Sequence, residues 1–255
     1  MTNLSSTLSG RVAVVTGGAN GIGLAAAKRF KALGATVLIG DVQDDALAVA
    51  GKENGFETLR CDVSQEADLA QLADKAKSLG PIGVVMANAG VALGGKMEHI
   101  PLSEWQRVLD INVVGVVRTF QPFLETLMDQ KSGHIIVTGS SASLRSDPSG
   151  MNAPYATTKT ALIGMTRALH NYLKPHDVSV HLLAPRMTDT AFPRKALGWG
   201  RKGSRVAGDY DIGVNDTPDQ VADALIKGME AGDYLISLLP ETKDVLRDFA
   251  ETHRP

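Results

Sequence analysis

The chain has 255 residues, a formal net charge of −2 and a single cysteine, Cys61. This length suits one α/β domain with a sizeable core, and the near-neutral charge gives no electrostatic reason to expect nucleic acid or a membrane surface as partner. One cysteine cannot form an intrachain disulfide, residues 1–10 lack the apolar core of a signal peptide, and no apolar run approaches the ~20 residues that span a bilayer, so we expect a cytoplasmic protein.

Short β-rich runs alternate with helical segments along the chain, which predicts a doubly wound parallel sheet with helices on both faces, in one α/β domain. The segment 103–130 is expected to hold two helices that meet near Asn112, and Thr217 to Gln220 form a capping box that starts the last helix. The expected strands are 12–16, 35–40, 56–61, 82–88, 133–139, 178–184 and 233–237, and the expected helices are 21–33, 44–54, 65–79, 103–130, 153–174 and 217–230.

The first strand leads into a Gly-rich turn, Thr16-Gly17-Gly18-Ala19-Asn20-Gly21-Ile22-Gly23. Glycines let the backbone turn sharply and approach a phosphate, and the N–H groups at the start of the next helix attract an anion. The order of strand, turn and helix is the context that a dinucleotide fingerprint requires. A tight connection without a ligand is the alternative. The turn predicts a site for the pyrophosphate of a dinucleotide.

Asp41 follows the second expected strand. An acidic side chain at this place can accept hydrogen bonds from both hydroxyls of an adenosine ribose, and it repels a 2′-phosphate. An ordinary turn aspartate is the alternative, but the upstream Gly-rich turn favours a role in selecting NAD over NADP.

Tyr155 and Lys159 are spaced as i and i+4, so they lie on one face of the helix expected there. A neighbouring cation stabilises a phenolate and lowers the pKa of the phenol, which can then exchange a proton with an alcohol or carbonyl oxygen. Without the Gly-rich turn, this pair would suit a solvated helix face. With the Gly-rich turn, the pair indicates hydride transfer.

These motifs, in this order, resemble those of the short-chain dehydrogenase/reductase family over nearly the whole chain. The matching segments are Thr16-Gly17 with Gly21 and Gly23, Asn88-Ala89-Gly90, Asn112, Ser140-Ser141-Ala142 and Tyr155-Ala156-Thr157-Thr158-Lys159. The resemblance implies a Rossmann-type fold, a homotetramer or at least a dimer, and a small-molecule alcohol or ketone as substrate.

The resemblance also implies a role for each catalytic residue. Tyr155 would be the general acid in reduction and the general base in oxidation, and Lys159 would lower its pKa and hold the nicotinamide ribose. Ser141 would hydrogen-bond the substrate oxygen, and Asn112 would connect Lys159 to solvent through water.

The identity of the serine is less firmly fixed, because Ser141 is one residue further from Tyr155 than is usual in the family. Ser140 and Ser143 remain weaker candidates.

The nicotinamide end departs from the family pattern, because Arg186 replaces the glycine that usually follows the proline. An arginine avoids positive φ, so this substitution puts the local backbone conformation in doubt. Asn20 stands where many NADP-preferring relatives carry a basic residue. The resemblance implies that Asp62 and Val63 lie at the adenine and that Thr188 and Thr190 contact the nicotinamide carboxamide. The implied NAD contacts are Gly17, Asn20, Gly21, Ile22, Gly23, Asp41, Asp62, Val63, Asn88, Ala89, Gly90, Tyr155, Lys159, Pro185, Thr188 and Thr190.

Residues 186–215 are rich in Gly and charge and show little periodicity, and the corresponding segment of the family closes over the substrate. Its first part carries one acid, Asp189, against six cations. A solvated loop is one interpretation, and recognition of an anionic substrate group, by Arg186 first, is the other. The cations are Arg186, Arg194, Lys195, Arg201, Lys202 and Arg205.

The favoured function is therefore an NAD-dependent secondary-alcohol dehydrogenase or carbonyl reductase. A 3-oxoacyl thioester reductase is an alternative, against whose NADPH-using version Asp41 argues. A non-catalytic dinucleotide sensor is another, disfavoured by the intact catalytic residues. No metal is expected, because His134, His170, His176 and His181 lack ligand spacing.

Overall fold

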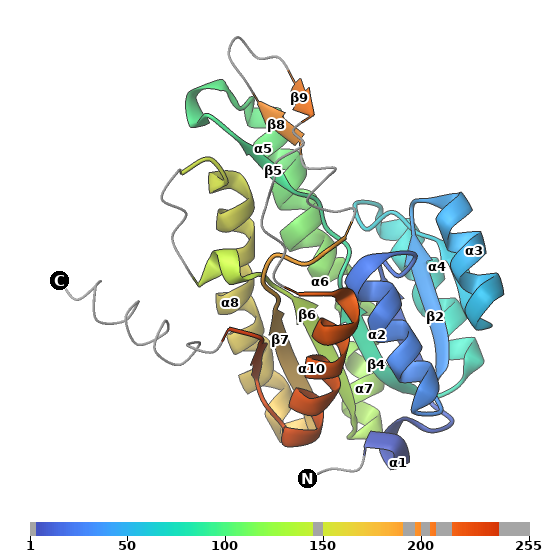
Figure 1. Cartoon of the computed structure of the whole chain (residues 1–255). Coiled ribbons are helices and arrows are strands. Elements are labelled where there is room, and N and C mark those ends of the chain that lie inside the picture. The colour runs from blue at the N-terminus through green and yellow to red at the C-terminus, as the bar shows by residue number, and fades with distance from the viewer. Residues whose placement is uncertain (1–3, 145–149, 191–196, 200–204, 208–215, 240–255) are drawn as a thin grey trace.

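The computed structural model describes residues 4–144, 150–190, 197–199, 205–207 and 216–239. Its main sheet is built from seven strands, all paired in parallel. They are β1 (Val12–Thr16), β2 (Thr36–Asp41), β3 (Glu57–Arg60), β4 (Ile82–Ala87), β6 (Gly133–Thr138), β7 (Val178–Ala184) and β10 (Leu235–Ser237). Their order across the sheet is β10-β7-β6-β4-β1-β2-β3 (Figure 1).

Both faces of this sheet are apolar because side chains alternate along each strand. In β1, Val12 and Val14 join one buried cluster and Ala13 and Val15 join the other. The first cluster includes side chains of α4 (Glu66–Leu79), α6 (Gly115–Phe120), α7 (Leu124–Gln130) and α8 (Ala153–Leu173), and the second those of α2 (Gly21–Ala32), α3 (Asp44–Asn54) and α10 (Pro218–Ala231). The doubly wound sheet predicted from the sequence is confirmed.

The ends of α10 have the expected chemistry. The Thr217 hydroxyl accepts a hydrogen bond from the Gln220 N–H at 3.2 Å, and the Gln220 side-chain oxygen accepts one from the Thr217 N–H at 2.8 Å. This is the predicted capping box, which satisfies two N–H groups at the start of the helix. Gly232 ends the helix with φ of 75°, a left-handed conformation that glycine adopts readily.

The segment expected to hold two helices has its junction at Asn112, as predicted. α5 (Leu102–Leu109) is followed by one turn of π-helix, η2 (Asp110–Val114), and then by α6. A second interruption, the short 3₁₀ helix η3 (Gln121–Phe123), carries a proline in its first turn. The remaining 3₁₀ turns are η1 (Met97–His99), η4 (Ser141–Ser143) and η5 (Lys174–His176).

Two features of the fold lie outside the sequence-based expectation. The helix α1 (Leu4–Leu8) covers the base of the sheet with Leu4 and Leu8 fully buried. A second small sheet joins β5 (Leu93–Gly95) in parallel to β8 (Leu197–Trp199), which pairs antiparallel with β9 (Arg205–Ala207). Elements of three to five residues are too short to establish a period.

Within the described residues, the helices are too short or too polar to cross a bilayer.

Candidate active site

The Gly-rich turn lies at the carboxyl end of β1, where the order of the main sheet reverses. β1 pairs with β2 on one side and with β4 on the other, and the chain continues from β4 away from β2 toward β6. Ligands of doubly wound sheets bind in the crevice at such a reversal. The predicted pyrophosphate turn therefore lies at the ligand-binding edge of this fold.

Three glycines of the turn are needed for its shape. Gly17 and Gly21 have φ of 65° and 56°, which side-chain-bearing residues adopt only at a cost. A Cβ on Gly23 would lie 2.2 Å from the Gly17 carbonyl oxygen, and one on Gly17 would lie 2.9 Å from the Ala89 Cα. The backbone of the turn is consequently packed directly against α2 and the loop after β4.

The start of α2 is suited to an anion. Asn20 precedes the helix, and in the described part of the chain its side chain makes no capping hydrogen bond. The first N–H groups of a helix need partners from outside it, and phosphate oxygens are suitable acceptors. Ile22, in the same turn, packs against the apolar cluster beneath α2. The turn and helix start thus fit a dinucleotide pyrophosphate.

Asn88 ties three strand ends together with its side chain. Its Nδ2 donates to the carbonyl oxygens of Thr16 and Gly17, both at 3.1 Å, and its Oδ1 accepts from the Thr138 hydroxyl at 3.1 Å. Each polar atom of this amide has a partner within the protein. Asn88 therefore holds the Gly-rich turn in shape, and a direct contact between its side chain and a nucleotide stays a prediction.

The two residues after Asn88 lie against other predicted site residues. Ala89 packs against the Gly-rich turn, as described above. A Cβ on Gly90 would lie 3.1 Å from the Asn112 Oδ1 and 3.7 Å from the Lys159 Nζ. Gly90 thus lies close to the side chains of Asn112 and Lys159, and a side chain at this position would crowd Asn112.

Asp41 is the last residue of β2 and is only 7% exposed. Its two carboxylate oxygens accept hydrogen bonds from the backbone N–H groups of Ala19, in the Gly-rich turn, and of Gln43, each at 3.1 Å. A carboxylate oxygen has room for a second donor. Asp41 is therefore fixed beside the turn, where an adenosine ribose is expected.

Asp62 and Val63, expected near the adenine, form part of a tight turn after β3. The Asp62 Oδ1 accepts from the Ser64 N–H and hydroxyl at 2.9 and 2.8 Å, and the Asp62 N–H donates to Asp68 at 2.9 Å. Val63 is buried against Gly115. The contact with adenine predicted for both residues is not tested by these interactions.

Tyr155 and Lys159 lie in the first two turns of α8, and the Lys159 Nζ is 5.8 Å from the centre of the Tyr155 ring. Lys159 is 3% exposed and donates a hydrogen bond to the Thr138 carbonyl oxygen at 2.8 Å. Burial disfavours its charged form and lowers the pKa of Lys159 to about 8. The ammonium is thus held close to the phenol, and it loses its proton at a lower pH than an exposed lysine does.

The pKa of Tyr155 is shifted in the direction opposite to the sequence-based expectation. Burial raises the pKa of this phenol, and a hydrogen bond with the Ser140 side chain lowers it by a smaller amount. Desolvation penalises the phenolate more than its neighbours stabilise it. Tyr155 is therefore a protonated acid at neutral pH in this environment.

The serine that contacts Tyr155 is Ser140. Its hydroxyl hydrogen-bonds the phenol and also accepts from the Ala142 N–H at 3.1 Å, as the N-cap of η4. Its backbone is extended, with φ of −168°, and the residue is largely buried. This geometry favours Ser140 as the serine of the catalytic group.

The neighbouring serines have other contacts. Ser141, chosen from the sequence, donates its backbone N–H to the Pro185 carbonyl oxygen at 2.9 Å. Ser143 donates its hydroxyl to the Ser140 carbonyl oxygen at 2.5 Å. Ser141 thus links the loop after β6 to the end of β7.

Asn112 lies in the π-turn and is fully buried. Its side chain exchanges two hydrogen bonds with the Val91 backbone, at 2.8 and 2.9 Å, and donates to the Thr158 hydroxyl at 3.1 Å. Thr158 in turn donates to the Tyr155 carbonyl oxygen at 2.8 Å. Asn112 therefore positions the first turn of α8, while its expected water path from Lys159 stays a prediction.

The segment after β7 connects the catalytic group to the Gly-rich turn. It begins at Pro185, which accepts the hydrogen bond from Ser141, and reaches Thr190, whose Cγ2 would lie 2.9 Å from a Cβ on Gly21. Thr188 is 5% exposed and donates its hydroxyl to the Arg186 carbonyl oxygen at 2.9 Å. The predicted carboxamide contacts thus lie on one short stretch of chain.

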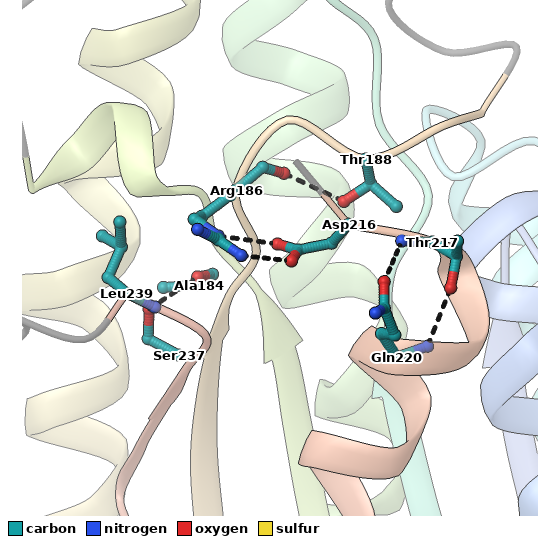
Figure 2. A network of polar contacts seen from close by, with 8 residues as sticks. All are labelled: Ala184, Arg186, Thr188, Asp216, Thr217, Gln220, Ser237 and Leu239. Atoms are coloured by element: carbon teal, nitrogen blue, oxygen red, sulfur yellow. Dashed lines mark hydrogen bonds and ion pairs between the residues drawn. The ribbon is translucent and has the colours of Figure 1, made fainter. Parts of the chain in front are cut away.

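Arg186 does not have the role that its sequence position suggested. Its guanidinium binds both carboxylate oxygens of Asp216, which is 4% exposed (Figure 2). This two-point contact engages Nε and Nη2, so these two donors are already paired within the protein. The Arg186 backbone also lies outside the left-handed region. Among the described residues other than glycine, Lys131 and Asp177 alone have a positive φ.

The other candidate groups carry no chemistry in the described structure. Burial raises the pKa of the Cys61 thiol to about 12, so Cys61 is a small buried apolar residue. The described residues include no cluster of three His, Cys, Asp or Glu side chains placed to hold a metal. Positions 194, 195, 201 and 202 of the basic segment lie outside the described residues.

The sequence alone assigns no role to three residues of this site, Thr138, Thr158 and Asp216. Thr138 receives the Lys159 hydrogen bond through its backbone, and Thr158 bonds Asn112, so neither has a signature of residue type alone. The position of Ser140 directly after β6 and Gly139 could have indicated the serine that contacts Tyr155. Counting residues back from Tyr155 favoured Ser141 instead. Asp216 had no signal, because it lies far from Arg186 in the sequence.

The chain is similar to several known proteins over most of its length. The short chain dehydrogenase family matches residues 11–199. A mitochondrial borneol dehydrogenase from Lavandula x intermedia is 33% identical over 190 residues, 73% of each chain. An acetoacetyl-CoA reductase from Synechocystis sp. is 33% identical over 192 residues, 73% of this chain and 75% of its own. The crystal structure of a Burkholderia phymatum short chain dehydrogenase/reductase in complex with NAD superposes with a TM-score of 0.83 at 25% identity, covering 98% of this chain and 97% of that one.

Proposed function

Because this chain belongs to the short-chain dehydrogenase/reductase family of nicotinamide-dinucleotide-dependent oxidoreductases, we propose that it interconverts a secondary alcohol and a ketone with NAD(H). The observation that carries the proposal is the group of the largely buried Ser140 and Lys159 with the partly buried Tyr155, at the crevice of the sheet beside the Gly-rich turn. The bound dinucleotide would supply the hydride acceptor or donor, and the protein would supply the proton.

The proton chemistry follows from the environments of the three side chains. In the reducing direction, the Tyr155 hydroxyl donates its proton to the oxygen of the substrate as that oxygen becomes an alkoxide. The Ser140 hydroxyl stabilises the same oxygen through a hydrogen bond. The Lys159 ammonium, 5.8 Å from the ring centre, favours the phenolate that remains. In oxidation the same proton moves from the alcohol to Tyr155.

The direct test of the proposal is turnover with a panel of secondary alcohols and NAD, followed by the absorbance of NADH. We expect at least one alcohol to give NADH at a rate proportional to enzyme concentration, and the matching ketone to consume NADH. A protein that bound NADH tightly but turned over no compound of the panel would instead be a dinucleotide sensor.

A thioester reductase is the second candidate, supported by the 33% identity to an acetoacetyl-CoA reductase. The panel therefore includes acetoacetyl-CoA with NADH and with NADPH. Reduction of this compound with a kcat/KM far above that of simple ketones would favour the thioester. A preference for NADPH in the same assay would also oppose the cofactor proposed here.

The cofactor preference is expected to depend on Asp41. Its buried carboxylate is held by two backbone N–H groups next to the Gly-rich turn, so a 2′-phosphate would meet a fixed negative charge. We expect the wild type to prefer NAD over NADP by at least about tenfold in kcat/KM, since ~1.4 kcal/mol of repulsion is sufficient. Asp41→Ala should reduce that ratio, because it removes both an acceptor for the ribose hydroxyls and the charge that repels the 2′-phosphate. Equal use of both cofactors by the wild type would contradict this role.

A homotetramer, or at least a dimer, is the proposed assembly. Leu109 and Val114 are 37% and 42% exposed beside the π-turn, and small residues of α8 line a shallow hollow of about 480 Å³. Exposed apolar surface of this kind favours association. Light scattering at micromolar concentration should give a mass several times the 26.9 kDa of one chain, and Val114→Arg should reduce it. A monomer of the wild type would contradict the proposal.

A further inference from the structure

The contact between Arg186 and Asp216 joins two parts of the chain that are both fixed from behind (Figure 2). On one side, the end of β7 is held to β10, because the Ser237 hydroxyl donates to the Ala184 carbonyl oxygen at 3.1 Å. On the other side, Asp216 directly precedes the capping box that begins α10. The ion pair therefore spans two rigid supports.

The backbone around the ion pair is connected as well. Asp216 donates its N–H to the Met187 carbonyl oxygen at 3.2 Å, and its own carbonyl oxygen accepts from the Asp189 N–H at 2.9 Å. Thr188 and Asp216 form an isolated parallel β-bridge. Together with the two bonds from the guanidinium, these contacts fix the course of residues 186–189.

The fixed segment borders the place where the reactive end of a dinucleotide would lie. It starts at Pro185, bonded to Ser141 next to the serine that contacts Tyr155, and it ends at Thr190 beside Gly21. A dinucleotide with its pyrophosphate on the Gly-rich turn and its reactive ring near Tyr155 must pass along this segment.

We propose that Arg186 and Asp216 are a positioning pair that shapes the segment from Pro185 to Thr190 for the nicotinamide half of the cofactor. Asp216 is almost fully buried and its carboxylate is matched by a planar fork with two donors. The Arg186 side chain therefore restricts the backbone conformation just after β7 through its ion pair with Asp216. The inference rests on the proposed function, because it assumes that the bound dinucleotide carries a nicotinamide.

The test compares the affinities of NADH and ADP-ribose, which lacks the nicotinamide, by titration calorimetry of the wild type and three variants. The variants are Arg186→Met, Asp216→Asn and the double variant. We expect Arg186→Met to weaken NADH by on the order of tenfold, because displaced positioning groups lose affinity steeply, and to change ADP-ribose by less than about twofold. Asp216→Asn should have a smaller effect, since Arg186 is partly exposed to solvent, with 28% of its side chain accessible.

The double variant and a control test whether the two residues act together. The double variant should bind NADH at least as well as Arg186→Met, because it removes the buried carboxylate left without a cation. Arg29→Met is the matched control, since Arg29 also pairs with aspartates of α10, Asp219 and Asp223, but from α2. We expect this control to bind both ligands like the wild type.

Equal losses for NADH and ADP-ribose, or unchanged NADH affinity in Arg186→Met, would overturn the proposal. If Arg186→Met does not fold, Arg186→Lys serves, because it keeps a cation opposite Asp216 but not the two-point geometry. Arg186→Lys should lose affinity for NADH and not for ADP-ribose, and the loss should be smaller than that of Arg186→Met. An equal loss of affinity for both ligands would again overturn the proposal. A wild type that bound ADP-ribose but not NADH would instead refute the proposed function.

Discussion

Replacement of Tyr155 by phenylalanine is expected to reduce turnover by ~10²–10⁴-fold, the usual contribution of a general acid or base. Tyr155 is partly buried, and the desolvation of its phenol raises the pKa, so at neutral pH it holds the proton that ketone reduction requires. Phenylalanine keeps the ring beside Lys159 and removes only the hydroxyl. The affinity for NADH should therefore change little, and the loss should fall on kcat.

Steady-state kinetics in both directions and an NADH titration measure these quantities. Tyr172→Phe is a matched control, because Tyr172 is on the same helix but 60% exposed, and it should leave activity unchanged. Retention of more than about a tenth of the wild-type rate by Tyr155→Phe would show that another group transfers the proton, since a positioned acid contributes at least ~10²-fold.

Lys159→Met is expected to combine a large loss of activity with an altered pH dependence of stability. Activity should fall because the ammonium that favours the phenolate is lost, and NADH affinity should fall because the lysine is expected to hold the nicotinamide ribose. Methionine has a similar length and no charge, so the core around α8 can stay packed.

The stability effect follows from the pKa of Lys159, lowered by burial from 10.5 to about 8. Below pH 8 the lysine is protonated in both the folded and the unfolded chain. The full cost of burying its ammonium then lowers the stability of the folded wild type. Between pH 8 and 10.5 the unfolded chain binds more protons than the folded one, so the wild type gains stability as the pH rises. The total gain is on the order of 3 kcal/mol at 1.36 kcal/mol per pKa unit.

Urea unfolding of both proteins from pH 7 to 10.5 measures this difference. Lys159→Met lacks the titrating group, so the stability of the wild type relative to the variant should rise across the interval. The neutral amine can still donate to the Thr138 carbonyl oxygen, and the loss of that bond in the variant therefore adds a constant offset. Two parallel curves would contradict the assignment of a depressed pKa to Lys159.

Local chemistry explains why much of this molecule could be predicted. The turn at Gly17, Gly21 and Gly23 combines positive φ with close backbone contact, and both requirements select glycine at fixed spacing. The capping box at Thr217 satisfies N–H groups within three residues of itself. The long apolar strands follow from burial on both faces. The positive φ values and the capping box are determined by neighbours in sequence, and the residue pattern marks the other features directly.

The features that could not be predicted depend on distant contacts or on very short elements. The choice of Ser140 over Ser141 depends on the extended backbone at the start of η4, which residue counting does not reveal. The partner of Arg186 lies 30 residues further along the chain. Leu4 and Leu8 are buried in a five-residue helix whose sequence shows no period.

The π-turn at residues 110–114 gives the two halves of its helix different rotational phases. Successive residues of an α-helix are ~100° apart around the axis, and a π-turn holds more residues per turn than the helix around it. Val108, before the turn, packs with Leu93 and Ile100, whereas Val116 and Phe120, after it, pack against the main sheet. Deleting one residue inside the turn would bring the two halves into phase and rotate Val116 and Phe120 away from the sheet. The shortened helix would then lose its core contacts. An equally short deletion in a surface loop would be tolerated.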